Sequence, residues 1–199
     1  MAKKLFLGTT NPVKVSIVRA AVCPLPVDLL IPDDLHLNLQ VAETGQTIQQ
    51  NAELKARAYC AQTGLPTLAM DGGLWIEKFP AEKQPGPLIK RIIDANKPMN
   101  EQAVLDYYVH ELAAVGGESA CTWEGAVVLA LPAGGLVSSS FSFQSILTSK
   151  PHGKIGPGLL LSPITIDPRS GRYESETPWD ERLDTQWVRR FITEHLDKL

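Results

Sequence analysis

The stretch over residues 43–75 constrains the fold more than any other part of the chain. It reads ETGQTIQQNAELKARAYCAQTGLPTLAMDGGLW. Thr47 and Gln50 have the spacing of a capping box, and Gly64 suits the end of a helix. Apolar residues recur between them near the helical period, so the pattern predicts one helix over residues 47–63. The apolar positions of this helix are Ile48, Ala52, Leu54, Ala58 and Ala61.

A short apolar segment, residues 66–70, follows this helix and is bounded by Pro and Gly. Such a segment is typical of a fully buried strand. Asp71 would then lie at the carboxyl end of the strand, where open α/β sheets bind ligands. Gly72 and Gly73 would let backbone amides approach an anion beside a carboxylate that holds a hard cation. The alternative is that Asp71 is an ordinary turn residue whose side chain bonds its own backbone.

The beginning of the chain shows a second strand and helix pattern. Residues 4–8 are expected to form a strand, and residues 13–21 a helix. Asn11 is a good N-cap and Pro12 a good first helical residue. Free amides and the positive end of the helix dipole meet there, which favours an anion, and Lys14 adds a full charge. The alternative for Lys14 is an exposed surface lysine without a ligand.

The remaining pattern indicates an α/β fold around a mixed sheet. Further strands are expected over residues 27–31, 119–131, 136–148 and 159–166. The two long runs are joined by Pro-Ala-Gly-Gly and predict an antiparallel hairpin. Asn100 caps an expected helix that ends before two glycines, and a short helix is expected within residues 85–93. Thr177 and Pro178 are expected to open the closing helices.

Composition limits the class of function. The chain has 199 residues, 44% hydrophobic and 21% charged, which predicts one domain, residues 1–199, of ordinary globular composition. A net charge of −3 gives no positive field for a nucleic acid polymer or an anionic membrane. No apolar run approaches the roughly 18 residues of a membrane span, and residues 1–14 are too polar for a signal peptide. Three cysteines without a CxxC pair indicate buried free thiols, so a cytoplasmic location is expected.

Four segments together show a family resemblance. In chain order they are TTNPVK, ETGQTIQQNAELKARA, GLPTLAMDGGL and PGPLIKR. In this order the chain resembles the inosine triphosphate pyrophosphatase family, also called Ham1-like, over about residues 4–93. That family typically carries Thr-Gly-Asn-x-x-Lys, Glu-Thr-Gly, Glu-Asn-Ala-x-x-Lys-Ala, Asp-Asp-Ser-Gly-Leu and a Pro-Gly pair. Each motif alone is weak, and the set is specific.

The resemblance implies an elongated two-lobed fold with a cleft between the lobes, and a homodimer. It also implies hydrolysis of nucleoside triphosphates, including those with hypoxanthine or xanthine bases, to the monophosphate and pyrophosphate with Mg²⁺. Carried onto this sequence, Glu43 and Asp71 would hold the metal and the attacking water. Asp71, Lys14 and Lys55 would be the catalytic residues. The substrate-binding set would be Thr10, Asn11, Lys14, Asn51, Lys55, Gly72, Gly73, Arg182 and Trp187.

The sequence departs from the family pattern at several of these positions. Met70 and Gly72 stand where the family has the first Asp and the Ser of Asp-Asp-Ser-Gly. Gln50 replaces a Glu before Asn51, and Ile17 replaces another Glu. Metal affinity or rate would therefore be low. The alternative function is a weakly active or inactive descendant that acts as a nucleotide-binding or protein-interaction module.

The family segments that read the base are also altered. Residues 158–163 are GLLLSP in place of an aromatic and acidic segment, and residues 186–188 stand in place of Ser-His-Arg, with Arg182 near a family lysine. An apolar pocket discriminates similar ligands by only about 10 to 200-fold, so strong preference for inosine triphosphate is not expected. Trp187 either stacks on a base or packs in the core with Phe191.

Overall fold

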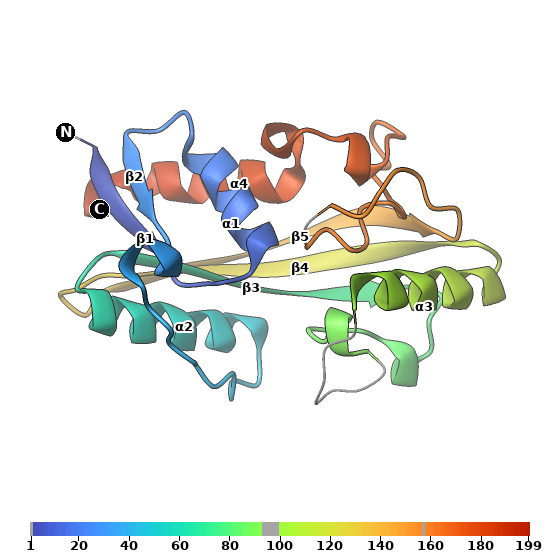
Figure 1. The fold of residues 1–199 in the computed structure, drawn as a ribbon, viewed down its shortest axis with the longest axis horizontal. Helices are drawn as coiled ribbons and strands as arrows, with labels where there is room; N and C mark the ends of the chain where they lie inside the picture. The colour runs from blue at the N-terminus through green and yellow to red at the C-terminus, as the bar shows by residue number, and fades with distance from the viewer. Residues whose placement is uncertain (1, 93–99, 157) are drawn as a thin grey trace. The chain divides into compact units, whose positions relative to one another are not determined.

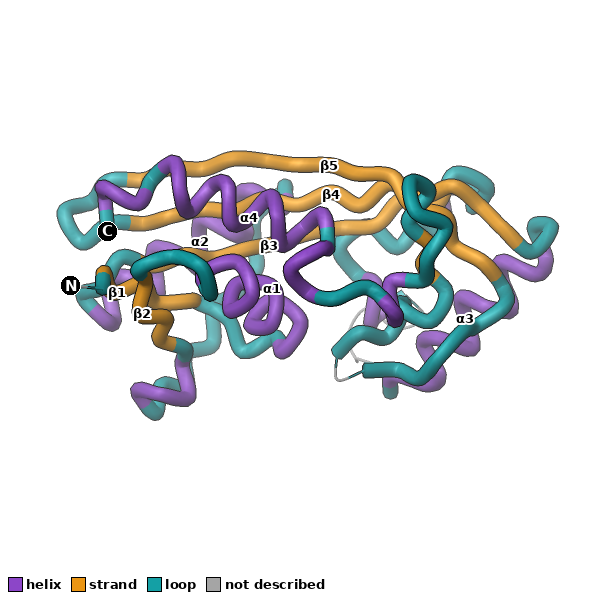
Figure 2. The backbone as a smooth tube through the Cα atoms, turned by 90° about the horizontal axis from the view of Figure 1, so that it is seen from above, coloured by secondary structure: helices purple, strands orange, loops and turns teal. Residues whose placement is uncertain are grey.

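The computed structural model describes residues 2–92, 100–156 and 158–199, and within them the chain folds around one mixed sheet of six strands. The strand order is β2-β1-β3-β4-β5-β6, and β3, β4 and β5 lie side by side (Figure 2). The strand bounds are β1 Lys3–Leu7, β2 Val27–Leu30, β3 Thr67–Ile76, β4 Glu118–Ala130, β5 Leu136–Thr148 and β6 Thr165–Ile166. Strand β1 pairs in parallel with β2 and β3, whereas β6 pairs antiparallel with β5. The predicted α/β class with a mixed sheet is confirmed.

The chain divides into two compact units. The first unit comprises the residues up to Asp71 together with Gly125–Phe141 and Trp179–Leu199. The second comprises Gly72–Glu124 and Ser142–Pro178. Strands β3, β4 and β5 contribute residues to both units, so the boundary falls within strands and not in a linker.

The first unit has helices on both faces of its sheet (Figure 1). Helices α1 (Pro12–Val22) and α4 (Leu183–Glu194) cover one face, and α2 (Ile48–Thr63) covers the other. Successive side chains of a strand point to opposite faces. In β3, Leu68 and Met70 therefore pack toward α1 and α4, while Ala69 packs toward α2. Asp71 follows in the same alternation and points to the α2 side.

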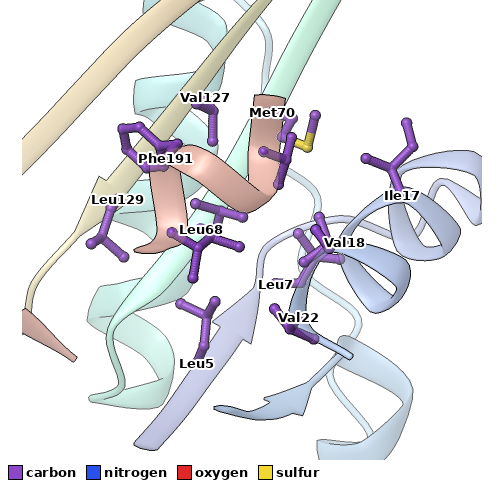
Figure 3. Close-up of a cluster of buried hydrophobic side chains, with 13 residues drawn as sticks. Leu5, Leu7, Ile17, Val18, Val22, Leu68, Met70, Val127, Leu129 and Phe191 are labelled. Atoms are coloured by element: carbon purple, nitrogen blue, oxygen red, sulfur yellow. The ribbon is translucent and has the colours of Figure 1, made fainter. Parts of the chain in front are cut away.

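The larger apolar cluster of the first unit fixes α1 and α4 on the sheet (Figure 3). It brings Val18 and Val22 of α1 together with Leu7 of β1, Leu68 of β3 and Phe191 of α4. Fully burying side chains of this size contributes about 1.5–3 kcal/mol each, which makes this cluster a main source of stability in the first unit. The cluster therefore holds the start of α1 at a fixed place beside β3.

The second unit is organised around helix α3 (Glu101–Ala114). The buried residues of α3 pack against β3 and β5 and against the apolar run at residues 160–164. They are Val104, Leu105, Tyr108 and Leu112. Asn100 caps the helix by accepting a hydrogen bond from the amide of Ala103 at 2.7 Å. Gly116 and Gly117 follow with φ of 100° and 87°, which confirms the predicted stop.

The two helices next to the predicted site also begin as expected. Asn11 caps α1 by accepting from the amide of Val13, with Pro12 at the first position. Thr47 and Gln50 form the capping box of α2, and Gly64 ends it with φ of 67°. The burial of α2 differs from the prediction, because Leu54 and Ala61 are exposed. Its buried residues are Asn51, Ala52, Lys55, Ala56, Tyr59 and Cys60.

Three other predictions are wrong. Strand β3 continues through Asp71, Gly72 and Gly73 to Ile76, so it does not end at residue 70 as expected. Of the run over residues 159–166 only Thr165–Ile166 is a strand, because successive turns hold the rest. Thr177 and Pro178 do not begin α4, since α4 starts at Leu183 after the 3₁₀ turn Trp179–Glu181. The short helix expected near residue 90 is the 3₁₀ turn Ile89–Arg91, and residues 93–99 lie outside the described chain.

Cys60 and Cys121 are buried free thiols as expected, but Cys23 is exposed. None of the helices in the described part of the chain has the length and apolar content that crossing a membrane requires.

Candidate active site

Asp71 is the centre of a buried group of charges in the first unit. Asp71 is only 8% exposed. The Nζ atoms of Lys55 and Lys14 lie 3.1 Å and 3.3 Å from the same oxygen, Oδ1. The other oxygen, Oδ2, is buried and has no hydrogen-bond partner among the described residues. A buried acceptor left unpaired is costly, so this oxygen is suited to accept a hydrogen bond from water or a ligand.

Helix α2 delivers Lys55 to Asp71 from the buried side. Asn51, Lys55 and Tyr59 follow one another at four-residue spacing on the face that contacts the sheet. Beside them, Ala52 and Ala56 pack against small residues of the sheet such as Ala69. These small side chains allow the helix backbone to lie close to β3, and the ammonium group of Lys55 therefore reaches a buried carboxylate.

Lys14 of helix α1 reaches Asp71 along the edge of β3 that lies beyond the end of β1. Two hydrogen bonds join β1 to the edge of β3: the amide of Phe6 donates to the carbonyl of Pro66, and the amide of Gly8 donates to the carbonyl of Leu68. The next acceptor in this series is the carbonyl of Met70, and Lys14 Nζ donates to it at 2.9 Å. The chain has left the ladder at that point to start α1, so a lysine replaces a backbone amide.

The electrostatic environment disfavours the charge on Lys14. Burial lowers the pKa of Lys14, and the nearby ammonium of Lys55 lowers it further. Asp71, and to a lesser extent Glu43, act in the opposite direction without cancelling the shift. An additional negative group at this place would therefore be favourable.

Glu43 joins the group through Lys55. Its Oε1 lies 3.3 Å from Lys55 Nζ, and its side chain is 54% exposed. The first turn of α2 holds the loop that carries it: Asn51 Oδ1 accepts from the amide of Gly45 at 2.8 Å, and Gln50 Oε1 accepts from that of Gln46 at 2.7 Å. Asn51 thus positions the Glu43 loop, a role that the prediction of substrate binding did not include.

Close packing also explains why two positions that the sequence alone did not single out are occupied by glycine. A Cβ atom on Gly45 would lie 2.7 Å from Asn51 Oδ1, so only glycine fits this contact. A Cβ atom on Gly8 would lie 2.8 Å from the ring of Tyr59. Tyr59 in turn donates to the carbonyl of Leu39 at 3.2 Å. The signal that could have found Tyr59 is its spacing of four residues from Lys55.

The residues predicted at the start of α1 have other partners. Asn11 Oδ1 accepts from the amide of Val13 at 2.9 Å, and the amide of Asn11 donates to Thr9 Oγ1 at 3.1 Å. Thr10 is exposed. Asn11 therefore shapes the loop before α1, and a contact of Thr10 or Asn11 with phosphate stays a prediction.

Gly72 and Gly73 belong to the second unit and have strand conformation. They continue the extended backbone of β3, because the strand does not end at Asp71. A Cβ atom on Gly73 would lie 2.6 Å from the ring of Trp75, so packing against this ring explains why the position is glycine. A phosphate contact of their amides stays a prediction.

Arg182 and Trp187 lie on or next to α4. Arg182 is buried, and its guanidinium lies 4.1 Å from the ring centroid of Trp179. The ring of Trp187 packs against Phe141 at 4.7 Å and Phe191 at 6.2 Å between centroids. These contacts agree with the interpretation of Trp187 as a core residue. Burial raises the pKa of Asp184, which lies between them in the chain.

The leucines expected to line an apolar base pocket are largely core residues. Leu160 and Leu161 are each 4% exposed and belong to the cluster around α3 in the second unit. Leu160 and Leu161 therefore stabilise that unit, and Leu159 beside them is half-buried.

The carboxylates fit a hard divalent cation only in part. Such cations take oxygen ligands, and Asp71 supplies a buried carboxylate. Glu43 supplies a second carboxylate on the other side of Lys55. Within residues 2–92, 100–156 and 158–199, however, no group of three or more His, Cys, Asp or Glu side chains surrounds such a position. A cation here would need most of its ligands from substrate or water.

Comparison with known proteins confirms the family resemblance that the motifs suggested. A model described as the Ham1 family matches residues 5–158, well over half of the chain. The chain belongs to the Ham1 family. A dITP/XTP pyrophosphatase of Xanthomonas axonopodis pv. citri is 30% identical over 97% of this chain and 96% of its own length. One from Thermus thermophilus is 30% identical over 90% of this chain and 83% of its own length.

Solved structures share the fold. A HAM1 protein from Coxiella burnetii has a TM-score of 0.73 at 22% identity and covers 96% of this chain and 99% of its own. The Staphylococcus aureus Ham1 protein has a TM-score of 0.71 at 17% identity, over 97% of this chain and 100% of its own. The family assignment confirms the predicted resemblance and fold. The names of the curated relatives bear out the expected class, a pyrophosphatase hydrolase.

Proposed function

We propose that this member of the Ham1 family hydrolyses nucleoside triphosphates at the bond between the α and β phosphates. Water adds to the α phosphorus, and the products are the monophosphate and pyrophosphate. The observation that carries the proposal is the buried Asp71, which has two lysines on one oxygen and an unpaired second oxygen. The names of the relatives support the same reaction.

The lysines supply charge stabilisation in this proposal. Cleavage of the anhydride concentrates negative charge on the leaving pyrophosphate, and fixed cations in a partly buried site stabilise that charge. Lys14 and Lys55 are the residues that would bind it, because both ammonium groups lie within 3.3 Å of Asp71. Asn51 and Gly45 hold Glu43 at the same place.

Asp71 would orient the attacking water and take its proton through Oδ2, the oxygen that has no protein partner among the described residues. Asp71 and Glu43 are also the residues that would hold Mg²⁺, with the remaining ligands from phosphate and water. Bound Mg²⁺ would polarise a phosphoryl oxygen and offset charge on the triphosphate.

The remaining expectations extend this proposal. Thr10, Asn11 and the amides of Gly72 and Gly73 would contact phosphates. Arg182 would lie toward the base, and Trp187 would contribute packing more than stacking. The whole chain, residues 1–199, would act as one cytoplasmic domain and as a homodimer, with a nucleoside triphosphate as its small-molecule partner and no polymeric nucleic acid or membrane.

A second function is favoured by one specific observation. No group of three or more His, Cys, Asp or Glu side chains that could hold a metal occurs in the described part of the chain, and Met70 packs into the apolar core where the family has an Asp. A protein that binds nucleotides with little turnover would have this arrangement.

One pair of assays separates the two functions. Pyrophosphate release is measured with Mg²⁺ over a panel of purine and pyrimidine triphosphates, and release well above the rate without protein supports the enzyme. Thermal stabilisation by triphosphates without release supports the binding protein. Neither release nor stabilisation with any nucleotide would contradict both.

The phosphate role of Lys14 has its own test. Lys14→Ala should weaken binding of the triphosphate far more than binding of the nucleoside, because the lysine lies at the expected phosphate position. Equal weakening of both ligands would show that Lys14 has another role.

A further inference from the structure

The ammonium group of Lys55 contacts both of the candidate metal carboxylates. It is 3.1 Å from Asp71 Oδ1 and 3.3 Å from Glu43 Oε1. A cation that bridges two carboxylates is the arrangement expected of a metal ion at the same place. Here a side chain of the protein itself supplies the positive charge.

Both candidate metal carboxylates already have lysine partners in this arrangement. Lys55 contacts Asp71 and Glu43, and Lys14 contacts Asp71. A divalent cation that arrives alone would have to compete with these lysines for the carboxylates, so it gains little attraction. Binding of the metal alone is therefore expected to be weak.

A triphosphate changes this balance because it offers the lysines other partners. Charge-assisted hydrogen bonds to phosphate oxygens are strong, and the four-carbon stem of lysine lets the ammonium group move while the backbone stays. Helix α2 is held on the sheet by Ala52 and Ala56, which are fully buried. Movement of the Lys55 side chain alone would release Glu43 Oε1 and remove one of the two lysine contacts on Asp71 Oδ1, while Lys14 keeps the other.

We propose that Lys55 occupies the cation position of the free protein and leaves it when a triphosphate binds. The divalent cation and the triphosphate then bind with positive coupling, and Lys55 is the residue that couples them. This inference rests on the proposed function, since it assigns the phosphate and metal partners of the same site. Such coupling is reciprocal, so each ligand tightens the other by the same factor.

The test measures binding of Mn²⁺ alone to the protein, without nucleotide, by calorimetry and by the electron paramagnetic resonance signal of free Mn²⁺. Lys55→Met removes the charge and keeps most of the apolar stem. We expect it to tighten Mn²⁺ binding by at least about tenfold, because a positive charge next to the metal position is lost. Lys55→Arg keeps a positive charge and should bind Mn²⁺ as weakly as the wild type.

Arg57→Met is the matched control. Arg57 lies on the same helix but pairs at the surface with Glu53. The substitution therefore removes one positive charge at a position away from the site. We expect no change in Mn²⁺ affinity for this variant. Circular dichroism of all three variants confirms that they are folded before binding is measured.

The coupling itself is measured with a triphosphate whose α–β bridging oxygen is replaced by methylene. Its affinity for the wild type should rise at least about tenfold with saturating Mn²⁺, and this gain should shrink in Lys55→Met. Unchanged Mn²⁺ affinity in folded Lys55→Met, or equal coupling in the variant and the wild type, would overturn the inference. Pyrophosphate release by the wild type decides the proposed function separately, because it does not depend on Mn²⁺ affinity without nucleotide.

Discussion

Replacing Asp71 by Asn tests the central residue of the site, because it keeps the volume of the side chain and removes its charge. Two ammonium groups lose their common partner, since both contact Asp71 Oδ1. Lys55 keeps Glu43, and Lys14 keeps the carbonyl of Met70. The two lysines would then repel each other with less compensation.

The expected loss of stability follows from the burial of these groups. Removing one partner of a fully buried ion pair costs about 3–5 kcal/mol. The side chain of Lys14 is 21% exposed and Lys55 retains a second partner, so we expect a smaller loss than this range, about 2–3 kcal/mol. For a chain of this length each kcal/mol lowers the Tm by about 2–4 °C, which gives a decrease of roughly 4–12 °C.

The assay is thermal unfolding of the wild type and Asp71→Asn at neutral pH, together with pyrophosphate release. Glu53→Gln is the matched control, because it makes the same chemical change in the surface pair with Arg57. Its effect should stay within about 0.5 kcal/mol, as expected for an exposed ion pair. Asp71→Asn should abolish release. A variant with unchanged or higher Tm, or with release close to that of the wild type, would refute the assigned role of Asp71.

Three other predictions follow from contacts of the described residues. Gly45→Ala should lower both stability and pyrophosphate release, because its Cβ atom would lie 2.7 Å from Asn51 Oδ1 and displace the loop of Glu43; normal release would show that the loop position is unimportant. Cys23 should react quickly with a thiol reagent in the native protein, whereas burial raises the pKa of Cys121 to about 12 and should protect it until denaturation; rapid labelling of Cys121 would contradict its burial. The kcat/KM ratio for inosine over adenosine triphosphate should stay below about a thousand, and a higher ratio would point to base-reading donors elsewhere.

The sequence determined the elements around the site because their signals are local. A capping box, a proline after Asn11 and a glycine after residue 63 each act within one helical turn, so α1, α2 and their boundaries followed from neighbouring residues. The two long β runs and the Pro-Ala-Gly-Gly segment between them likewise predicted the hairpin of β4 and β5. The family motifs identified Lys14, Lys55 and Asp71 as residues of one site.

The tertiary structure decided which faces are buried and where strands end. In α2 the sheet buries Asn51 and Lys55 and leaves Leu54 exposed, the reverse of what side-chain polarity predicts. The reason is that Asp71 and the Glu43 loop provide partners for these polar groups, and such partners come from distant parts of the chain. Strand β3 passes through the double glycine because β4 continues beside it while β1 has ended.

The sequence by itself thus determined the helices near the site, the mixed α/β class and three charged residues, Lys14, Lys55 and Asp71, that the structure brings together. Only the tertiary structure decided that two lysines share one oxygen of Asp71, that Asn51 holds a loop, and that Trp187 packs beside Phe141. The physical reason is the separation along the sequence over which each kind of interaction acts. Caps and periodicity act between residues a few positions apart, whereas a buried charge acquires its partners only when α1, α2 and β3 pack together.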